Sequence, residues 1–420
     1  MSETLFQLAL ANSNSLFQQG SFQKAREYAE KALNLAEKSG NMEHFFRAVE
    51  TLAGIYMETG EDELCIEATQ TIVNFFKPIL EKNPGDMQAR AHLTSAYFGL
   101  GALARKNLDI EAALYYCVQC YQVTYDWLYQ LKDIERPLHV RKFQHSSSCE
   151  HLCDLFKLTE DWDNLAIYGK EYANLMEELV EEAPYELDYQ YFFCMAYYYW
   201  GSSCARSGRI AEAEKYLTTA LNAVRDLGEK YPANTDHLHI SYYLVTELGK
   251  IFQKNGNPER ALEFYNEQYI LSQRIRAAMP ANSDMLWNEG VAANNIADIY
   301  IALGRLDEAL PFLVRSEEIF VEQCSDSPDN FKPLHGLHNV DLSFLNYYLL
   351  RGDLRSGVDY CERSVKAMRE IIHSFGDNVP YKKHYLGMLK ERLEKNANLY
   401  DQLCLPQDAA RRRAEARLIN

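Results

Sequence analysis

Three side chains that bind soft metal ions are spaced four residues apart near the middle of the chain. His145, Cys149 and Cys153 would share one face of a helix, because residues four apart are neighbours on a helix surface. Histidine nitrogen and cysteine sulfur are ligands that zinc prefers. A buried cysteine also packs as a small apolar side chain, and both cysteines fall at positions where neighbouring segments carry packing residues. Packing is the favoured interpretation and a zinc site the alternative, so we expect no metal.

A second pair of cysteines, Cys117 and Cys120, has the Cys-x-x-Cys spacing of redox motifs. Redox chemistry requires a lowered thiol pKa, which a helix N-terminus can supply, whereas this pair is predicted to lie in the middle of a helix. The sequence contains no Ser-His-Asp context, nucleophile elbow, glycine-rich phosphate loop or metalloprotease motif. It therefore predicts neither an enzyme nor a cofactor.

Composition describes a folded, acidic protein. The 420 residues carry a net charge of −17 and are 47% hydrophobic. The negative charge opposes nonspecific binding to nucleic acid and to anionic membranes, so we expect neither partner. No apolar run approaches the length of a membrane span, and the N-terminus lacks a basic leader followed by an apolar stretch. The ten cysteines show no disulfide framework, so the expected location is the reducing cytoplasm.

The elements that must position these residues follow from an internal repeat. Gly208, Gly256, Gly304 and Gly352 are each 48 residues apart, and a small residue follows each of them five positions later. Periods of this size are typical of solenoids built from helix pairs. Extending the register over the whole chain gives nine turn positions, which are Gly20, Gly60, Leu108, Glu160, Gly208, Gly256, Gly304, Gly352 and Cys404.

Other columns of the repeat keep the same register. Small residues recur seven positions before the turn, and aromatic residues recur four before it and eight after it. The small side chain would let two helices approach closely, and the aromatic rings would fill the space beside it. Proline follows 24 residues after most turns and would end the second helix. These prolines are Pro84, Pro184, Pro232, Pro280 and Pro328.

These columns resemble the tetratricopeptide repeat, most clearly in the segment Asn294–Leu310. The usual unit of that family has 34 residues, so the 48-residue period resembles its long-repeat, kinesin-light-chain-like bacterial members. The resemblance implies an all-α solenoid of about nine antiparallel helix pairs, forming one right-handed superhelix over residues 1–420. It also implies a concave groove lined by the first helix of each pair, and a protein or peptide partner. The polar, arginine-rich last helix separately predicts a cap at 381–420.

In the resembled family the groove positions of each first helix lie thirteen, ten, six, three and two residues before the turn. We refer to these as the groove columns. In the middle pairs they hold six basic residues against Glu150 and Asp154, which predicts a positive groove for an acidic partner segment. The alternative is that these cations only complement helix C-termini. The predicted partner-binding residues are Arg105, Lys106, Lys157, Tyr198, Arg206, Lys250, Lys254, Asn294, Asn339 and Asn346.

Tyr198 belongs to the aromatic run 189–200, which is denser than packing requires. Such a run indicates either a helix buried on several sides or a contact surface. The three asparagines are expected to hydrogen-bond a peptide backbone. The leading functional interpretation is a non-catalytic interaction scaffold. The alternatives are a peptide-sensing regulator whose superhelical pitch changes on binding, and an enzyme subunit with an unrecognised site.

Overall fold

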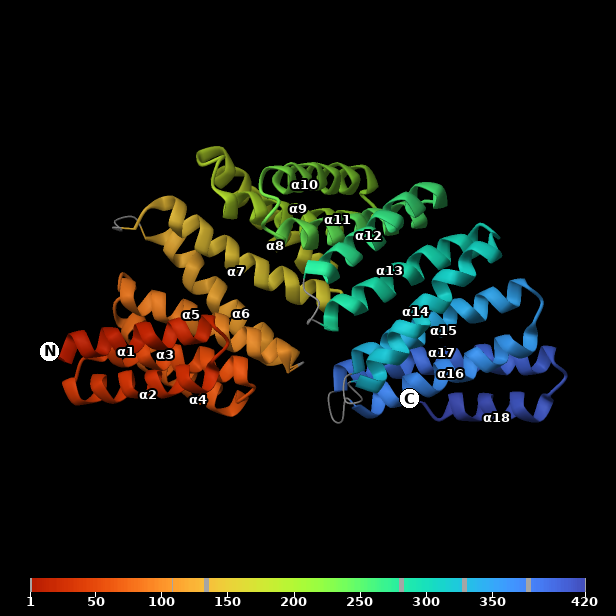
Figure 1. Ribbon diagram of the computed structural model, residues 1–420, viewed down its shortest axis with the longest axis horizontal. Coiled ribbons are helices and arrows are strands. Elements are labelled where there is room, and N and C mark those ends of the chain that lie inside the picture. The colour runs from red at the N-terminus through yellow and green to blue at the C-terminus, as the bar shows by residue number, and fades with distance from the viewer. Residues whose placement is uncertain are drawn as a thin grey trace. The chain divides into compact units, whose positions relative to one another are not determined.

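The computed structural model describes residues 2–107, 109–131, 136–278, 283–326, 331–374 and 379–419. These residues form eighteen α-helices and one π-helical segment, with no β-strand among them (Figure 1). The predicted all-α class is therefore confirmed. The helices are α1 (Ser2–Gln18), α2 (Phe22–Ser39), α3 (Met42–Thr59), α4 (Asp62–Lys82), α5 (Met87–Lys106), α6 (Ile110–Tyr125), η1 (Asp126–Gln130), α7 (Leu138–Leu158), α8 (Trp162–Glu182), α9 (Leu187–Arg206), α10 (Ile210–Lys230), α11 (Asp236–Lys254), α12 (Pro258–Ala278), α13 (Ser283–Ala302), α14 (Leu306–Asp326), α15 (Phe331–Leu350), α16 (Leu354–Ser374), α17 (Val379–Gln402) and α18 (Pro406–Arg417).

The predicted turns fall between an odd-numbered helix and the helix that follows it. Eight of the nine turn positions have φ between 56° and 77°, the left-handed conformation that ends a helix. Glu160 and Cys404 adopt it without being glycine, so the register holds even where the glycine has been replaced. Leu108 lies outside the described residues, as do Pro280 and Pro328. Pro84, Pro184 and Pro232 each follow the end of a second helix by two residues, as expected.

The aromatic columns stack inside each pair. The rings of Phe252 and Phe264 lie 5.5 Å apart at 6°, and those of Phe156 and Tyr168 lie 5.4 Å apart at 17°. In both pairs one ring stands four residues before the turn and the other eight residues after it. The two helices of a pair are thus joined by one repeated aromatic contact, which the sequence period predicts.

The small residues seven positions before each turn allow that aromatic contact to form. A Cβ added at Gly249 of α11 would lie 2.5 Å from Cε1 of Tyr265 in α12. A Cβ at Gly201 of α9 would lie 2.7 Å from Cγ of Leu217 in α10. Real Cβ atoms do not approach other carbons so closely, so the absence of a side chain at these positions sets the spacing of the two helices.

Gly249→Ala is expected to lower the free energy of unfolding by about 1–3 kcal/mol, because overpacking forces neighbouring side chains out of their rotamers. Gly54→Ala in α3 is the control, since a Cβ there meets no atom within 4 Å. This control should be neutral or stabilising by up to about 1 kcal/mol, because alanine favours helix more than glycine does. Urea denaturation measures both effects, and equal changes in the two variants would contradict the close-packing account.

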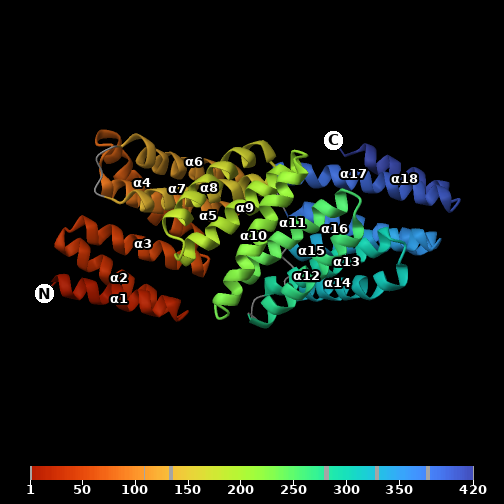
Figure 2. The same cartoon turned by 90° about the horizontal axis from the view of Figure 1, so that it is seen from above.

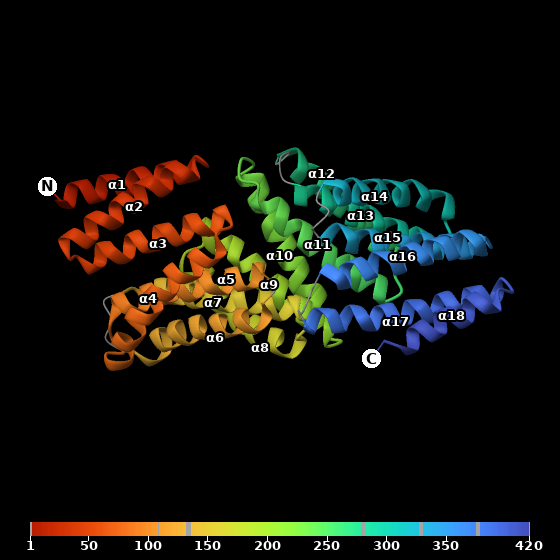
Figure 3. The same ribbon diagram turned by 90° about the horizontal axis from the view of Figure 1, so that it is seen from below.

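The helices fall into two compact units, Met1–Tyr185 and Glu186–Asn420. Within each unit the helices pack mainly on their neighbours in sequence (Figures 2 and 3). A single continuous array over 1–420, its right-handed sense and the capping role of 381–420 stay predictions. No described helix is both long and apolar enough to span a membrane.

Candidate binding groove in the second unit

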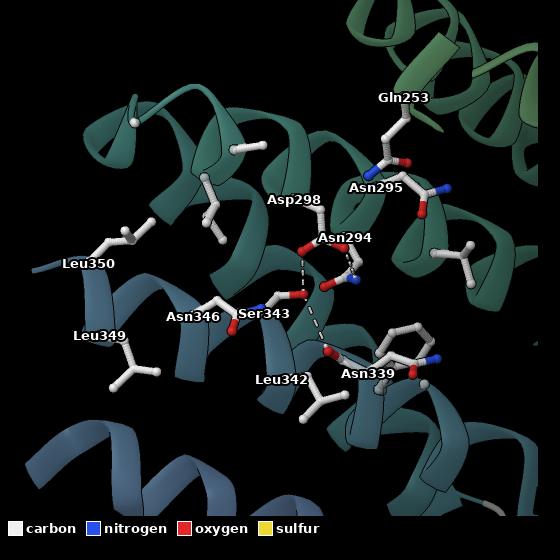
Figure 4. A pocket seen from close by; sticks show the side chains of 16 residues that line it. Gln253, Asn294, Asn295, Asp298, Asn339, Leu342, Ser343, Asn346, Leu349 and Leu350 are labelled. Carbon is white, nitrogen blue, oxygen red and sulfur yellow. Dashed lines mark hydrogen bonds between the residues drawn. The ribbon is translucent and has the colours of Figure 1, made fainter. Parts of the chain in front are cut away.

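A cavity of about 940 Å³ opens in the second unit along α13 and α15 (Figure 4). Gln253 of α11 and Phe320 of α14 complete parts of its wall. Its lining contains all five groove columns of both first helices. These ten residues are Val291, Asn294, Asp298, Ile301 and Ala302 on α13, and Asn339, Leu342, Asn346, Leu349 and Leu350 on α15. The groove positions inferred from the resemblance therefore face one cavity in these two pairs, and their binding role stays a prediction.

One wall of the cavity is polar and centres on Asp298. Its Oδ1 accepts a hydrogen bond from the Ser343 hydroxyl at 2.5 Å, and its Oδ2 accepts one from Nδ2 of Asn294 at 3.3 Å (Figure 4). Burial raises the pKa of the Asp298 carboxyl to about 6, and the bond from Ser343 opposes this shift. Asp298 is the one titratable side chain among the described residues that line the cavity.

Asn294 has an unused acceptor. Its side chain is 8% exposed, and Oδ1 has no hydrogen-bond partner among the described residues. A buried polar atom without a partner costs about 1–3 kcal/mol. Oδ1 of Asn294 is therefore an acceptor without a partner at the cavity wall, and the binding role of Asn294 stays a prediction.

A second, smaller cavity of about 200 Å³ lies at the ends of α9 and α11. Its lining includes Arg206, Lys250 and Lys254, three of the predicted binding residues. The Lys250 ammonium lies 2.9 Å from Oε1 of Glu247, whose side chain is 6% exposed. Gln253 lines both cavities, and both lie along first helices of this unit. We call their combined lining the second-unit groove.

The other predicted cations lie in the first unit and already have partners there. Nη1 of Arg105 lies 2.6 Å from Oδ2 of Asp154, an acidic groove-column residue on the next first helix. The Lys106 ammonium lies 3.3 Å from Oδ1 of Asp62. That of Lys157 lies 5.8 Å from the centre of the Trp162 ring. The structure thus divides the six cations between two units, and ion pairs offset at least part of the charge in the first.

Tyr198 is 8% exposed and lies among other rings. Its ring centre is 5.1 Å from that of Tyr199 and 5.7 Å from that of Tyr243 on α11. Within the aromatic run, Tyr191 and Trp200 are buried as well. These burials favour the packing interpretation for the buried half of the run.

The cysteine-histidine face forms a closed network rather than an open site. His145, Cys149 and Glu171 offer ligand atoms within 4.8 Å of one another. However, Nδ1 of His145 lies 2.9 Å from Oγ1 of Thr124 and Nε2 lies 3.2 Å from Oε1 of Glu171, while the Tyr121 hydroxyl donates to Oε2. Burial raises the pKa of the Cys149 thiol well above its ordinary value, so metal binding would have to remove a tightly held proton.

The Cys-x-x-Cys pair is equally unreactive. Cys117 and Cys120 are buried inside α6, and burial raises the pKa of both thiols to about 11. Because the thiolate is the reactive form, neither residue is prepared for thiol–disulfide exchange.

Sequence reasoning missed two residues of the second-unit groove. Ser343 stands nine positions before its turn, outside the groove columns, yet its hydroxyl reaches Asp298 on the neighbouring first helix. Asn295 also lines the cavity and donates to Oε1 of Gln268 at 3.0 Å. In both cases the sequence places a polar residue directly beside a groove column, which could have suggested a place in the groove. Only the packing of α13 on α15 shows which of these polar residues point into the cavity.

Comparisons with known proteins agree on the fold. The family model described as the tetratricopeptide repeat matches residues 7–39 and 292–319. The apo form of the quorum sensor NprR from B. thuringiensis is 12% identical, with a TM-score of 0.55 and 98% of each chain covered. A Rap protein complexed with Competence and Sporulation Factor is also 12% identical, with a TM-score of 0.52, covering 100% of this chain and 98% of that one.

A third structure, aspartyl phosphate phosphatase F from Bacillus subtilis, is 11% identical, with a TM-score of 0.52, covering 100% of this chain and 94% of that one. No curated protein matched the sequence. At these identities the structural likeness concerns the fold alone. Together with the turn register and the packing columns, it shows that this chain is an all-α helical-repeat protein, two segments of which match the tetratricopeptide-repeat model.

Proposed function

We propose that the second-unit groove binds an extended peptide segment of a protein partner, and that the protein acts as a non-catalytic interaction scaffold. The observation that carries this proposal is the unpartnered Oδ1 of Asn294 in a cavity of about 940 Å³. That volume falls within the range of ordinary ligand sites, about 300–1,000 Å³.

The chemistry of the lining suits a peptide backbone. Asn294, Asn339 and Asn346 each carry one amide, which can both donate and accept hydrogen bonds, as does every peptide unit of an extended segment. Asn339 and Asn346 come from α15 and stand two helical turns apart. Leu342 and Leu349 of the same helix line the cavity as well and offer contact to an apolar side chain.

Two proteins of similar fold are consistent with this role, since NprR is a quorum sensor and the Rap protein is complexed with Competence and Sporulation Factor. A sensing role for this chain would add a structural change on binding. Small-angle scattering with and without a bound peptide would measure that change.

The ten cysteines are all free thiols, which supports a cytoplasmic location as part of the proposal.

A selection from a displayed library of random heptapeptides tests this function. Enriched peptides are expected to bind the full chain with a measurable Kd in fluorescence anisotropy, and to lose affinity when groove residues of α13 or α15 are replaced. The proposal is wrong if no peptide is enriched, or if the enriched peptides bind such groove variants as tightly as the unaltered protein.

A further inference from the structure

One first helix of the second unit is polar where the others are apolar. Twelve and eight residues before the turn, α17 carries Arg392 and Asn396. At the same two positions the three preceding first helices carry buried apolar residues, which are Leu244 and Leu248, Ala292 and Ile296, and Val340 and Phe344. In α15 these positions contribute to an apolar cluster shared with α14. Helix α17 therefore packs on α16 with a charged group and an amide in place of apolar side chains.

Arg392 lacks a counter-charge. Its side chain is partly exposed, its Nε atom is buried without a hydrogen-bond partner, and no carboxylate among the described residues forms an ion pair with it. Burial lowers the pKa of the guanidinium, because a charge withdrawn from water without a partner is unfavourable. The helix dipole does not compensate this charge, since Arg392 stands ten residues before the end of α17 and that field acts only within the last turn.

Lys395 stands three residues further along α17 and has no carboxylate partner either among the residues that the structure describes. Its ammonium donates to Oδ1 of Asn346 on α15 at 3.4 Å, and Asn346 lines the cavity of about 940 Å³ (Figure 4). Lys395 stands nine positions before its turn, as Ser343 does, and like Ser343 it reaches the preceding first helix. Burial and the charge of Arg392 lower the pKa of Lys395. The two cations therefore repel each other, and the ammonium lies one hydrogen bond from the cavity lining.

The described side chains around the two cations supply no paired anion. Glu391 and Glu394 lie beside them on α17, but both are exposed and neither forms an ion pair with either cation, although the charge of Glu391 offsets part of the repulsion. Burial raises the pKa of the Cys361 thiol on α16 to about 11 and lowers that of His338 on α15 to about 4, so both groups are neutral near pH 7. Nε2 of His338 and both amide atoms of Asn396 are buried without a partner.

We propose that Arg392 and Lys395 form an anion site beside Asn346, and that this site holds a carboxylate of the peptide in the second-unit groove. The inference rests on the proposed peptide-binding function and names a chemical group of its ligand. A guanidinium binds a carboxylate through two parallel hydrogen bonds, and an ammonium adds further donors. The carboxylate belongs either to an Asp or Glu side chain or to the C-terminus of the segment.

An unpaired charge that awaits a ligand lowers the stability of the protein without that ligand. Arg392→Met keeps an unbranched side chain and removes the charge, so the full chain without peptide should melt about 2–4 °C higher. Arg274→Met is the control, because Arg274 is an exposed arginine of α12 that lines neither cavity, and its melting temperature should stay unchanged. Differential scanning calorimetry measures both variants. A melting temperature that falls or does not rise in Arg392→Met would mean that the fold already compensates this charge, and would overturn the inference.

Selections with two heptapeptide libraries identify the source of the carboxylate. One library ends in a free C-terminus and the other in a neutral linker, and each is selected against the full chain and against Arg392→Met/Lys395→Gln. With the unaltered protein, enrichment of Asp or Glu in the linker library assigns the site to a side chain. Enrichment confined to the library with free C-termini assigns it to the terminal carboxylate. With the double variant the carboxylate preference should disappear, while peptides are still enriched through the rest of the groove.

Affinities of one selected peptide separate binding from a structural role. Neutralising its carboxylate, by glutamine or by C-terminal amidation, should weaken binding to the unaltered protein about tenfold and leave binding to the double variant unchanged in fluorescence anisotropy. If the double variant loses the same affinity for the charged and the neutralised peptide, the two cations do not contact the carboxylate. Enriched peptides without a carboxylate preference would overturn this inference and leave the proposed function intact. Libraries from which nothing is enriched would overturn both.

Discussion

Phe320→Ala is expected to lower the free energy of unfolding of the second unit by about 3–5 kcal/mol, the range observed when large buried rings are truncated. The Phe320 side chain is 1% exposed and lies between two glycines. A Cβ added at Gly336 of α15 would lie 2.4 Å from its ring, and one at Gly290 of α13 would lie 2.9 Å away. The ring therefore fills a space that three helices leave for it.

Urea denaturation of the full chain measures this effect, with tryptophan fluorescence and circular dichroism as readouts. Val321→Ala is the matched control, since Val321 is the next residue of α14 and is 45% exposed. We expect that change to stay within about 0.5 kcal/mol, as is usual for surface substitutions. Because Phe320 and Gly336 also line the cavity, the same variant should weaken peptide binding. Similar destabilisation by both variants would mean that the ring does not hold α13, α14 and α15 together.

Asn294→Ala is expected to weaken binding of a selected peptide about 10- to 100-fold, corresponding to about 1.4–2.8 kcal/mol. The substitution removes the buried, unpartnered Oδ1, which in the proposed complex accepts a hydrogen bond from a ligand N–H group. It also removes the Nδ2 group that donates to Asp298. Hydrogen bonds to buried groups contribute energies of this size when the alternative is an unsatisfied partner. Fluorescence anisotropy with a labelled peptide gives the affinity directly.

Asn222→Ala is the control for this prediction. Asn222 is an exposed asparagine on α10, in the same unit, and belongs to neither cavity lining. Its replacement should leave the affinity unchanged. Thermal unfolding of both variants would separate a lost contact from a lost fold, because Asn294→Ala should retain the two-unit structure. If both asparagine variants bind the peptide equally well, Asn294 is not a recognition residue.

The sequence was sufficient to locate the turns because their geometry is local. A left-handed residue is required at each of them, and the 48-residue spacing repeats that requirement, so even Glu160 and Cys404 could be assigned from register alone. The stacking of Phe252 on Phe264 follows from the same period. Helix pairing was therefore predictable from the period, whereas the columns of α13 and α15 that face the cavity followed from the resemblance.

The pairing of the groove charges was not predictable from the groove columns. The sum over the middle pairs predicts a positive surface, and this stays a prediction, but a sum does not say which side chains of successive first helices contact one another. Arg105 and Asp154 are 49 residues apart in sequence and yet form an ion pair. Likewise, Glu171 reaches His145 from another helix, so the network around His145 depends on the packing of α7 on α8. Such cross-helix partners are set by the spacing and rotation of whole helices, which no single-helix pattern encodes.

Photo-crosslinking tests the central claim, that a peptide lies along the first helices of the second unit. A selected heptapeptide with one apolar residue replaced by benzoylphenylalanine would be irradiated with the full chain, and the attachment sites mapped by mass spectrometry. The account predicts crosslinks on α11, α13 and α15, concentrated around Leu342, Leu349 and Asn294. Crosslinks confined to the second helices α14 and α16, or to residues 1–185, would contradict it.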